Sequence, residues 1–392
     1  MPAAFTQQSA SSIAFAENRV DGLPKDIGRL ARDARHVLVV SDPGIVASGV
    51  ARRITDIVGG GGLKVTLFHE VKSDPTAASV DQAADIARAN PGSVVIGLGG
   101  GSALDVAKLA AAIAPASEPA EHYALGQNRL PRNPLPKIMI PTTAGTGSEV
   151  TRTSVITSAD HRKLWAWGEE LRADLALLDP TLTVTLPKHL TAATGVDAMV
   201  HAIEGCTVKR SQPVADANCL HAIRLITEHL PRAVSTPDDL EARGMMLIAA
   251  ALAGLGFDST GTGVAHAMGH ALGALAGVHH GRAVGLCLRA ALDFNAEAAP
   301  ARHAAVARAM GAPSDGKSDA ELAASLAAHY DAFLRKVELK IALDDSGLTG
   351  ADAGRLAALT LAPENQPMCQ ANARALDEAD AERIAGTLLN AA

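Results

Sequence analysis

The chain has 392 residues and a formal net charge of −7, with 35 lysine and arginine residues against 42 aspartate and glutamate residues. This length allows two domains with hydrophobic cores of their own and no need for disulfide support. An acidic chain with scattered basic residues offers no basic surface for a phosphate backbone, which argues against nucleic-acid binding. We therefore expect an enzyme or a small-molecule binding protein.

Sequence features that report on location point to a cytoplasmic protein. The first 20 residues are polar and contain no signal-peptide apolar core, and the longest apolar stretches are short or interrupted by glycine and charge, so we expect no membrane span. The four cysteines form no CxxC pair, which favours reduced thiols over a zinc or disulfide framework.

Short apolar and β-branched runs alternate with helix-like segments in the first half of the chain. The runs are His36–Val40, Leu63–Phe68, Val94–Leu98, Lys137–Ile140 and Leu175–Leu178. Such alternation predicts parallel strands joined by helices. For residues 1–184 we expect an α/β nucleotide-binding domain with a parallel, Rossmann-like sheet.

Asp42 lies just beyond the first of these runs. A carboxylate at this place can accept hydrogen bonds from an adenosine ribose and would repel a 2′-phosphate, which favours NAD over NADP. The alternative is that Ser41–Gly44 simply forms a turn.

A glycine-rich loop, Gly99–Ser102, follows the third run and precedes a helix start. Glycine lets the backbone approach a pyrophosphate, and a helix N-terminus adds amide donors and a favourable dipole. The spacing is not GxGxxG, and a tight turn alone could use the same residues. However, a second glycine- and threonine-rich loop, Pro141–Thr151, follows the next run and should emerge at the same edge of the sheet. Two such loops favour a nucleotide.

Beyond Pro187 the strand pattern stops, and alanine- and leucine-rich segments with helical periodicity follow. Examples are residues 216–229, 240–255, 284–297 and 319–336. We expect an all-α metal-binding domain over residues 185–392, with a hinge between Pro180 and Pro187.

One carboxylate and several histidines of this second half have the spacing of a divalent-metal site. Asp197 and His201 are four residues apart in a helical stretch, so they project from one face. His266 begins a second such face with His270 at i+4, and His280 follows in a turn-like segment. One carboxylate and three imidazoles suit Fe²⁺ or Zn²⁺. A single histidine on an alanine-rich helix is more often packed or exposed than a ligand.

Several long motifs follow one another along the chain. They are Gly99–Lys108, Pro141–Thr151, Leu190–Glu204, Val264–Gly273 and His280–Gly281. With these motifs, the chain resembles the iron-containing (group III) alcohol dehydrogenase family over essentially its whole length. The resemblance implies reversible hydride transfer between nicotinamide and a small alcohol, hydroxy acid or diol, with the alkoxide stabilised by a divalent metal. It also implies a homodimer.

The resemblance also implies roles for individual residues. The implied metal ligands are Asp197, His201, His266 and His280, with Fe²⁺ as the native ion and Zn²⁺ as an alternative. The implied NAD contacts, which could also serve NADP, are Asp42, Gly99, Gly100, Gly101, Ser102, Asp105, Thr142, Thr143, Thr151 and Lys163. His270 should lie near the metal without ligating it. We expect His270 to be the catalytic proton relay, and the alternative is that it only supports the metal site.

Two segments depart from the family pattern and leave the substrate open. Residues 257–263 replace a stretch that often contains asparagine and alanine, and Asn372–Arg374 replaces the common Asn-Pro-Arg. Alternative functions are a metal- and NAD-dependent lyase resembling dehydroquinate synthase, a maleylacetate reductase-like activity, or a non-catalytic protein that kept the fold. Sparse lysine and arginine around the metal motifs argue against the lyase, whose phosphorylated substrate needs a basic pocket.

Overall fold

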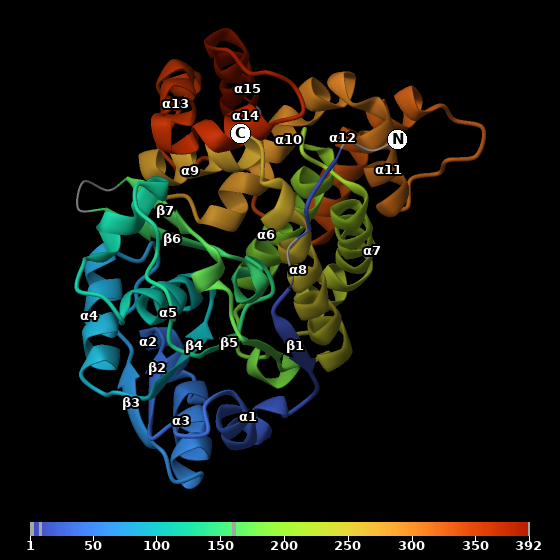
Figure 1. Cartoon of the computed structure of the whole chain (residues 1–392). Coiled ribbons are helices and arrows are strands. Elements are labelled where there is room, and N and C mark those ends of the chain that lie inside the picture. The colour runs from blue at the N-terminus through green and yellow to red at the C-terminus, as the bar shows by residue number, and fades with distance from the viewer. Residues whose placement is uncertain (1–3, 8–9, 159–161, 391–392) are drawn as a thin grey trace. The chain divides into compact units, whose positions relative to one another are not determined.

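A computed structural model describes residues 4–7, 10–158 and 162–390 (Figure 1). The chain divides into two compact units. Residues 9–143 and 147–186 form the first, here called the α/β unit, and residues 1–8, 144–146 and 187–392 form the second, here called the helical unit. The expected domain division between residues 184 and 185 stays a prediction.

The α/β unit is built on a six-stranded parallel sheet in the order β1-β8-β5-β4-β2-β3. Its strands are β1 (Ser12–Phe15), β2 (His36–Val40), β3 (Lys64–Phe68), β4 (Ser93–Gly99), β5 (Lys137–Pro141) and β8 (Leu175–Leu178). Strands β2, β4 and β5 are buried along their whole length, which explains their continuous apolar sequences. The predicted parallel α/β fold is confirmed.

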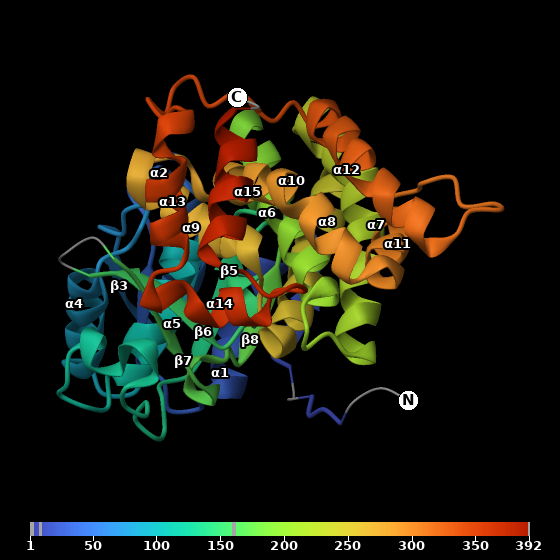
Figure 2. The same cartoon turned by 90° about the horizontal axis from the view of Figure 1, so that it is seen from above.

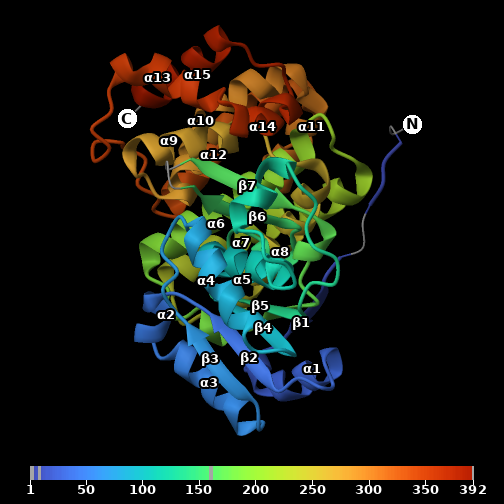
Figure 3. The same cartoon turned by 60° about the vertical axis from the view of Figure 1, so that its left-hand side comes forward.

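Helices cover both faces of this sheet. They are α1 (Leu23–Leu30), α3 (Val50–Gly60), α4 (Ala77–Arg88) and α5 (Gly101–Ile113). The short helix α2 (Pro43–Ala47) follows β2 and has no buried residue. Because strand side chains alternate between faces, Val37 and Val39 belong to a core with residues of α1 and α3, whereas Leu38 and Val40 belong to a core with residues of α4 and α5. Figure 3 shows α3 on one side of β2 and β3, and α4 and α5 on the other. An antiparallel pair, β6 (Thr153–Thr157) and β7 (Lys163–Trp167), completes the unit.

The helical unit contains no strand among its described residues, so the all-α prediction is confirmed (Figure 2). Its helices are α6 (Lys188–Thr207), α7 (Pro213–Ser235), α8 (Leu240–Thr260), α9 (Val264–Ala276), α10 (His280–Ala298), α11 (Pro300–Ala309), α12 (Asp319–Lys336), α13 (Ala353–Thr360), α14 (Gln366–Ala371) and α15 (Glu378–Asn390). Helix α6 is buried on every side along most of its length, as expected of the central helix of a bundle.

One described helix, α8, is long and apolar enough to cross a membrane by length and composition alone. Most of its apolar window is buried in the structure, and the core helix of a globular fold passes the same test. Helix α8 is therefore only weak support for a membrane span.

Candidate functional site

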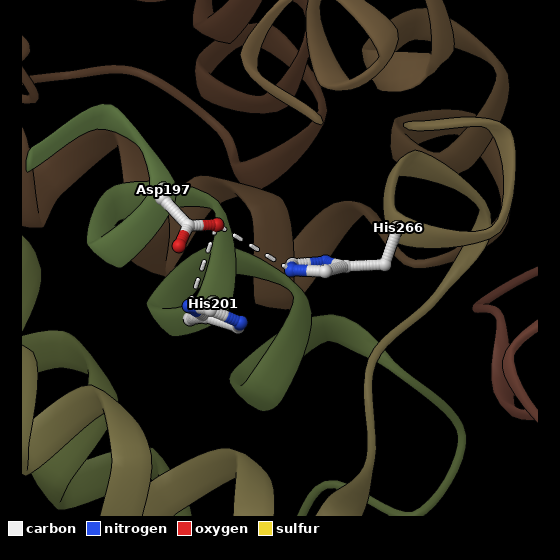
Figure 4. Close-up of side chains that lie close together, drawn as sticks. All are labelled: Asp197, His201 and His266. Carbon is white, nitrogen blue, oxygen red and sulfur yellow. Dashed lines mark ion pairs between the residues drawn. The ribbon is translucent and has the colours of Figure 1, made fainter. Parts of the chain in front are cut away.

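The central helix α6 places Asp197 and His201 on one face, one turn apart. Asp197 Oδ1 lies 3.7 Å from His201 Nδ1, and both side chains are buried (Figure 4). An isolated buried carboxylate is costly, so Asp197 needs a positive partner.

Two neighbouring helices bring further histidines to the same carboxylate oxygen. His266 Nε2 of α9 lies 3.7 Å from Asp197 Oδ1, and His280 Nε2 of α10 lies 3.5 Å from it. His266 is buried, whereas the side chain of His280 is 38% exposed. His280 is the first residue of α10 and does not lie in the expected turn-like segment, because the helix begins directly after the exposed His279.

Three buried atoms at this place have no hydrogen-bond partner among the described residues. They are Asp197 Oδ1, His201 Nδ1 and His266 Nε2, and the donor atoms of these three residues lie within 4.8 Å of one another. A buried polar atom left without a partner costs about 1–3 kcal/mol. Ligand atoms that share one cation at ~2.1 Å lie about 3.4 Å apart in a tetrahedral site, close to the spacing found here. The residues therefore fit a divalent cation.

Glycines at the helix crossings allow α6, α9 and α10 to approach one another. A Cβ on Gly281 of α10 would lie 2.2 Å from the carbonyl oxygen of Ala193 in α6. A Cβ on Gly269 of α9 would lie 2.5 Å from Val284 Cγ1 in α10. Larger side chains at these glycines would force the ligand-bearing helices apart.

Burial and mutual charge set the protonation of this group. Burial raises the pKa of Asp197, but His201, His280 and His266 outweigh it and hold that pKa well below its usual range. Burial lowers the pKa of His201 to about 3, so this imidazole stays neutral. Burial also opposes a charge on His266, yet Asp197 and Glu204 raise its pKa to about 9. An ionised carboxylate is therefore present for a cation at neutral pH.

His270 lies one turn beyond His266 on α9 and outside the group of three donor residues. Its ring centroid is 6.4 Å from that of His266 and 5.3 Å from that of His280. On α8, the ring of Phe257 stacks on His201 with centroids 4.3 Å apart and planes 15° apart. Phe257 lies in residues 257–263, where the sequence departs from the family pattern. The sequence alone did not predict a role for Phe257 beside the histidines.

In the α/β unit, the first glycine-rich loop joins β4 to α5 at the carboxyl edge of the sheet. Gly99 has a φ of +147°, and a Cβ there would lie 2.9 Å from Asp42 Oδ2, so this position requires glycine. Within the described α/β unit, no side chain caps the N-terminus of α5. Amide groups of this helix end, around Gly101 and Ser102, can therefore meet a phosphate.

The second loop, Pro141–Thr151, leaves β5 directly beside the first. Strands β4 and β5 pair in parallel, and the Thr142 amide donates to the Gly99 carbonyl at 2.9 Å, so both loops start at the same edge as predicted. The Thr142 hydroxyl is buried without a hydrogen-bond partner in the described chain. The Thr143 side chain lies 3.5 Å from where a Gly100 Cβ would be. Glycine backbone, an uncapped helix end and an unpartnered hydroxyl fit a nucleotide.

Asp42 has a local structural partner at the same edge. Its Oδ1 accepts hydrogen bonds from the amides of Gly44 and Ile45 at 2.9 and 3.1 Å, and so caps α2. These two hydrogen bonds support the alternative that Asp42 has a structural role in the turn Ser41–Gly44. The other carboxylate oxygen, Oδ2, faces the glycine-rich loop at Gly99.

Asp105 and Thr151 connect α5 to the second loop. Asp105 accepts hydrogen bonds from Ser148 Oγ at 2.5 Å and from the Val155 amide at 2.8 Å. Thr151 Oγ1 lies 3.4 Å from Nζ of Lys108, a fully buried lysine that also donates to the Ser148 carbonyl at 2.9 Å. These contacts shape the loop. Lys108 had no role in the sequence analysis, although it closes the Gly99–Lys108 motif.

Lys163, the last expected cofactor residue, begins β7, and its Nζ pairs with the exposed Asp74. At the end of the same strand, Trp167 is 52% exposed, with the Arg152 guanidinium 5.0 Å from its ring centroid. The contact of Lys163 is that of a surface ion pair and lends no support to a cofactor role.

Glu204 is a further buried group to which the sequence analysis assigned no role. Its Oε2 lies 2.6 Å from His266 Nδ1. Glu204 is seven residues after Asp197, which places both on one face of α6, and this spacing is the signal that could have found it.

The sequence matches two family models in succession. The model for iron-containing alcohol dehydrogenase matches residues 10–180, and that for the C-terminal part of the Fe-containing alcohol dehydrogenase family matches residues 191–389. The chain is 34% identical over 381 residues to Long-chain-alcohol dehydrogenase 1 of Geobacillus thermodenitrificans, and the match covers 94% of each protein.

Solved structures agree with these matches. A 1,3-propanediol oxidoreductase superposes with a TM-score of 0.90 and 29% identity, covering 97% of this chain and 98% of that one. The sulfoacetaldehyde reductase from Bifidobacterium kashiwanohense, solved in complex with NAD⁺, has a TM-score of 0.86 and 30% identity and covers 97% of each chain. The chain therefore belongs to the iron-containing alcohol dehydrogenase family of metal-dependent, NAD-linked oxidoreductases.

Proposed function

We propose that this protein interconverts a small alcohol, hydroxy acid or diol with the corresponding aldehyde or ketone, and that Asp197, His201, His266 and His280 hold its divalent cation. The observation that carries the proposal is the convergence of three partnerless buried donor atoms. Both matching family models describe alcohol dehydrogenases, which disfavours the lyase alternative.

Oxidation of an alcohol removes a proton from its hydroxyl and a hydride from its carbon. When bound, the cation supplies Lewis acidity that lowers the pKa of the alcohol, and the nicotinamide accepts the hydride. Asp197 supplies the negative charge that holds the cation, and the neutral imidazole of His201 supplies a lone pair. His270 is proposed to carry the released proton, because it lies one turn beyond His266 on α9 and its ring centroid is 5.3 Å from that of His280 on α10.

We assign the cofactor diphosphate to Gly99–Ser102 and to Thr142 and Thr143. Glycine backbone at the uncapped start of α5 and the unpartnered Thr142 hydroxyl support this assignment. Asp42 is proposed to favour NAD over NADP through repulsion of a 2′-phosphate. Asp105 and Thr151 are proposed to support cofactor binding indirectly, by shaping the second loop, Pro141–Thr151. Fe²⁺ is the family's metal, and the donor set also suits Zn²⁺.

We further propose a homodimer in the cytoplasm. Strand β1 lies at the edge of the sheet, and its Ile13 and Phe15 are 43% and 44% exposed. An exposed apolar edge strand pairs readily with another chain, here a second copy. The four cysteines are free and buried, which suits a reducing compartment. Light scattering on the purified protein tests the dimer.

Replacing His201 and His270 separately with alanine tests the site. His201→Ala removes a donor atom and should abolish metal retention and turnover, while NAD binding persists because Gly99–Ser102, Thr142 and Thr143 belong to the other unit. His270→Ala should keep the metal but lower the rate and change its pH dependence. Metal analysis, NAD titration and turnover on a panel of alcohols, diols, hydroxy acids and their carbonyl partners measure these effects. The assignment is wrong should His270→Ala lose the metal while His201→Ala keeps it.

A further inference from the structure

Glu204 makes a buried contact with the nitrogen of His266 that does not face the proposed metal site. Glu204 Oε2 lies 2.6 Å from His266 Nδ1, while His266 Nε2 faces Asp197 Oδ1 at 3.7 Å. Glu204 and His266 are 2% and 3% exposed, so water does not compete for this contact. The carboxylate and the proposed metal position thus use different nitrogens of one ring.

The second oxygen of Glu204 is occupied by backbone. Oε1 accepts a hydrogen bond from the amide of Ala265, in the first turn of α9, at 2.8 Å. The neighbouring amide, of Val264, donates to Asn372 Oδ1 at 3.2 Å. A Cβ on Gly263 would lie 2.9 Å from Glu204 Oε1 and 2.8 Å from Asn372 Oδ1, so glycine leaves room for both acceptors.

Asn372 is itself held in one orientation by Asn295. The Asn372 side-chain amide donates to Asn295 Oδ1 at 2.8 Å, and the Asn295 amide donates back to Asn372 Oδ1 at 3.1 Å. Asn372 also donates to the Arg374 carbonyl at 2.9 Å. Both side chains are buried. The Val264 amide needs the oxygen of Asn372 and the Arg374 carbonyl needs its NH₂, so these two contacts fix the Asn372 amide and, through the reciprocal pair, that of Asn295. The start of α9 is therefore fixed from two directions.

An ionised carboxylate only accepts hydrogen bonds. With Oε1 of Glu204 occupied by the Ala265 amide, Oε2 requires an N–H at His266 Nδ1. A histidine that binds a cation must be neutral, so the proton that leaves is that of Nε2 and the lone pair lies there. We propose that Glu204 is a positioning residue that selects this tautomer of His266 and fixes its ring so that Nε2 is available to the cation. This inference rests on the proposed metal site.

A purely structural role for Glu204, closing the end of α9, makes a different prediction. Glutamine would then be a milder substitution than alanine, because it has nearly the same shape and can still accept from Ala265. If Glu204 selects the tautomer, glutamine is harmful in its own right. Its single oxygen stays with the Ala265 amide, which cannot become an acceptor, so its NH₂ faces His266 Nδ1 and favours the proton on Nε2.

The test is the dissociation constant of Zn²⁺ from the metal-stripped full-length protein, measured by competition with a chromogenic chelator. We expect Glu204→Gln to weaken zinc binding by about 10- to 100-fold, at least as much as Glu204→Ala, although its melting temperature stays closer to that of the unsubstituted protein. Zinc binding by Glu204→Gln that is unchanged, or tighter than that of Glu204→Ala, would overturn the inference.

Two control variants separate this inference from the proposed site. Asp26→Asn removes another buried carboxylate, which pairs with Arg19 and Arg29 in the α/β unit, and it should leave zinc binding unchanged. A change in zinc binding there would mean that loss of any buried carboxylate suffices, and would also overturn the inference. His201→Ala should lose zinc. If His201→Ala binds zinc like the unsubstituted protein, the proposed ligand set is wrong. If His201→Ala loses zinc binding but Glu204→Gln keeps it, only the proposed role of Glu204 is wrong.

Discussion

Replacing Gly281 with alanine should damage the metal site without removing any donor atom. The new Cβ would lie 2.2 Å from the Ala193 carbonyl oxygen in α6 and 3.2 Å from Asp197 Cβ. Since a tolerable carbon–oxygen contact needs about 3.2 Å or more, α10 and α6 must separate locally by roughly 1 Å. Backbone lies on both sides of this contact, so no side-chain rotation relieves it.

The cost follows from this displacement. Overpacking of this kind typically destabilises a protein by about 1–3 kcal/mol. His280, which precedes Gly281, would move relative to Asp197, from which its Nε2 is now 3.5 Å away. Metal–ligand distances tolerate only about ±0.2 Å. We therefore expect zinc affinity to fall by at least about 10-fold, and the melting temperature of the metal-stripped protein to fall by roughly 2–4 °C per kcal/mol.

Chelator competition and thermal unfolding of Gly281→Ala measure both effects. Gly386→Ala in α15 is the matched control, because no atom of the described residues lies within 4 Å of the added Cβ, apart from its chain neighbours and the nearby backbone of its own helix. Alanine there should be neutral or stabilising by up to about 1 kcal/mol, since glycine is a poor helix former. If Gly281→Ala binds zinc and melts like this control, close approach of α10 to α6 does not set the site.

Three further changes test the α/β unit. Asp42→Asn keeps the cap on α2 but removes the charge, so the ratio of kcat/KM with NADP to that with NAD should rise, and an unchanged ratio would make Asp42 only a cap. Lys108→Met leaves the buried Ser148 carbonyl and Asp105 without their cation and should lower the free energy of unfolding by about 3–5 kcal/mol, measured in urea; unaltered stability would contradict this. Burial raises the pKa of Glu149 from 4.5 to about 7 against the opposing effects of a backbone hydrogen bond and Lys108. The protonated form of Glu149 stabilises the fold, and this stabilisation is complete below about pH 4.5 and lost as pH rises through about 7. The melting temperature of Glu149→Gln, relative to that of the unsubstituted protein, should therefore rise between about pH 5 and pH 8. A difference in melting temperature that stays constant over this range would contradict the pKa shift.

Strands buried on both faces were predictable because burial leaves a continuous apolar sequence. The run His36–Val40 coincides with β2. Strand β1 was not predicted, because it has four residues and is mostly exposed, so its sequence carries little burial pattern. Strands β6 and β7 contain Thr153, Ser154 and Lys163, and this polarity masks their alternation.

The candidate site was predictable only as far as single helices carry it. Asp197 and His201 share a face of α6 by their spacing alone. His266 and His280 reach that face only because three helices cross in a particular way. Local sequence does not specify this crossing, and the family resemblance supplied these two residues as ligands. Glu204 also lies on this face, but its role depends on where α9 begins.

The hydrogen bond from Val264 to Asn372 joins two parts of the helical unit that are 108 residues apart in sequence. Only a short connection separates Val264 from His266. Ordering of the C-terminal segment around Asn372 and cation binding at His266 are therefore thermodynamically coupled. By thermodynamic reciprocity, whatever cation binding contributes to the order of that segment, the ordered segment contributes to cation affinity. Hydrogen exchange at the Val264 amide should therefore slow when the cation binds. Loss of the C-terminal segment should lower cation affinity, although that segment supplies no ligand.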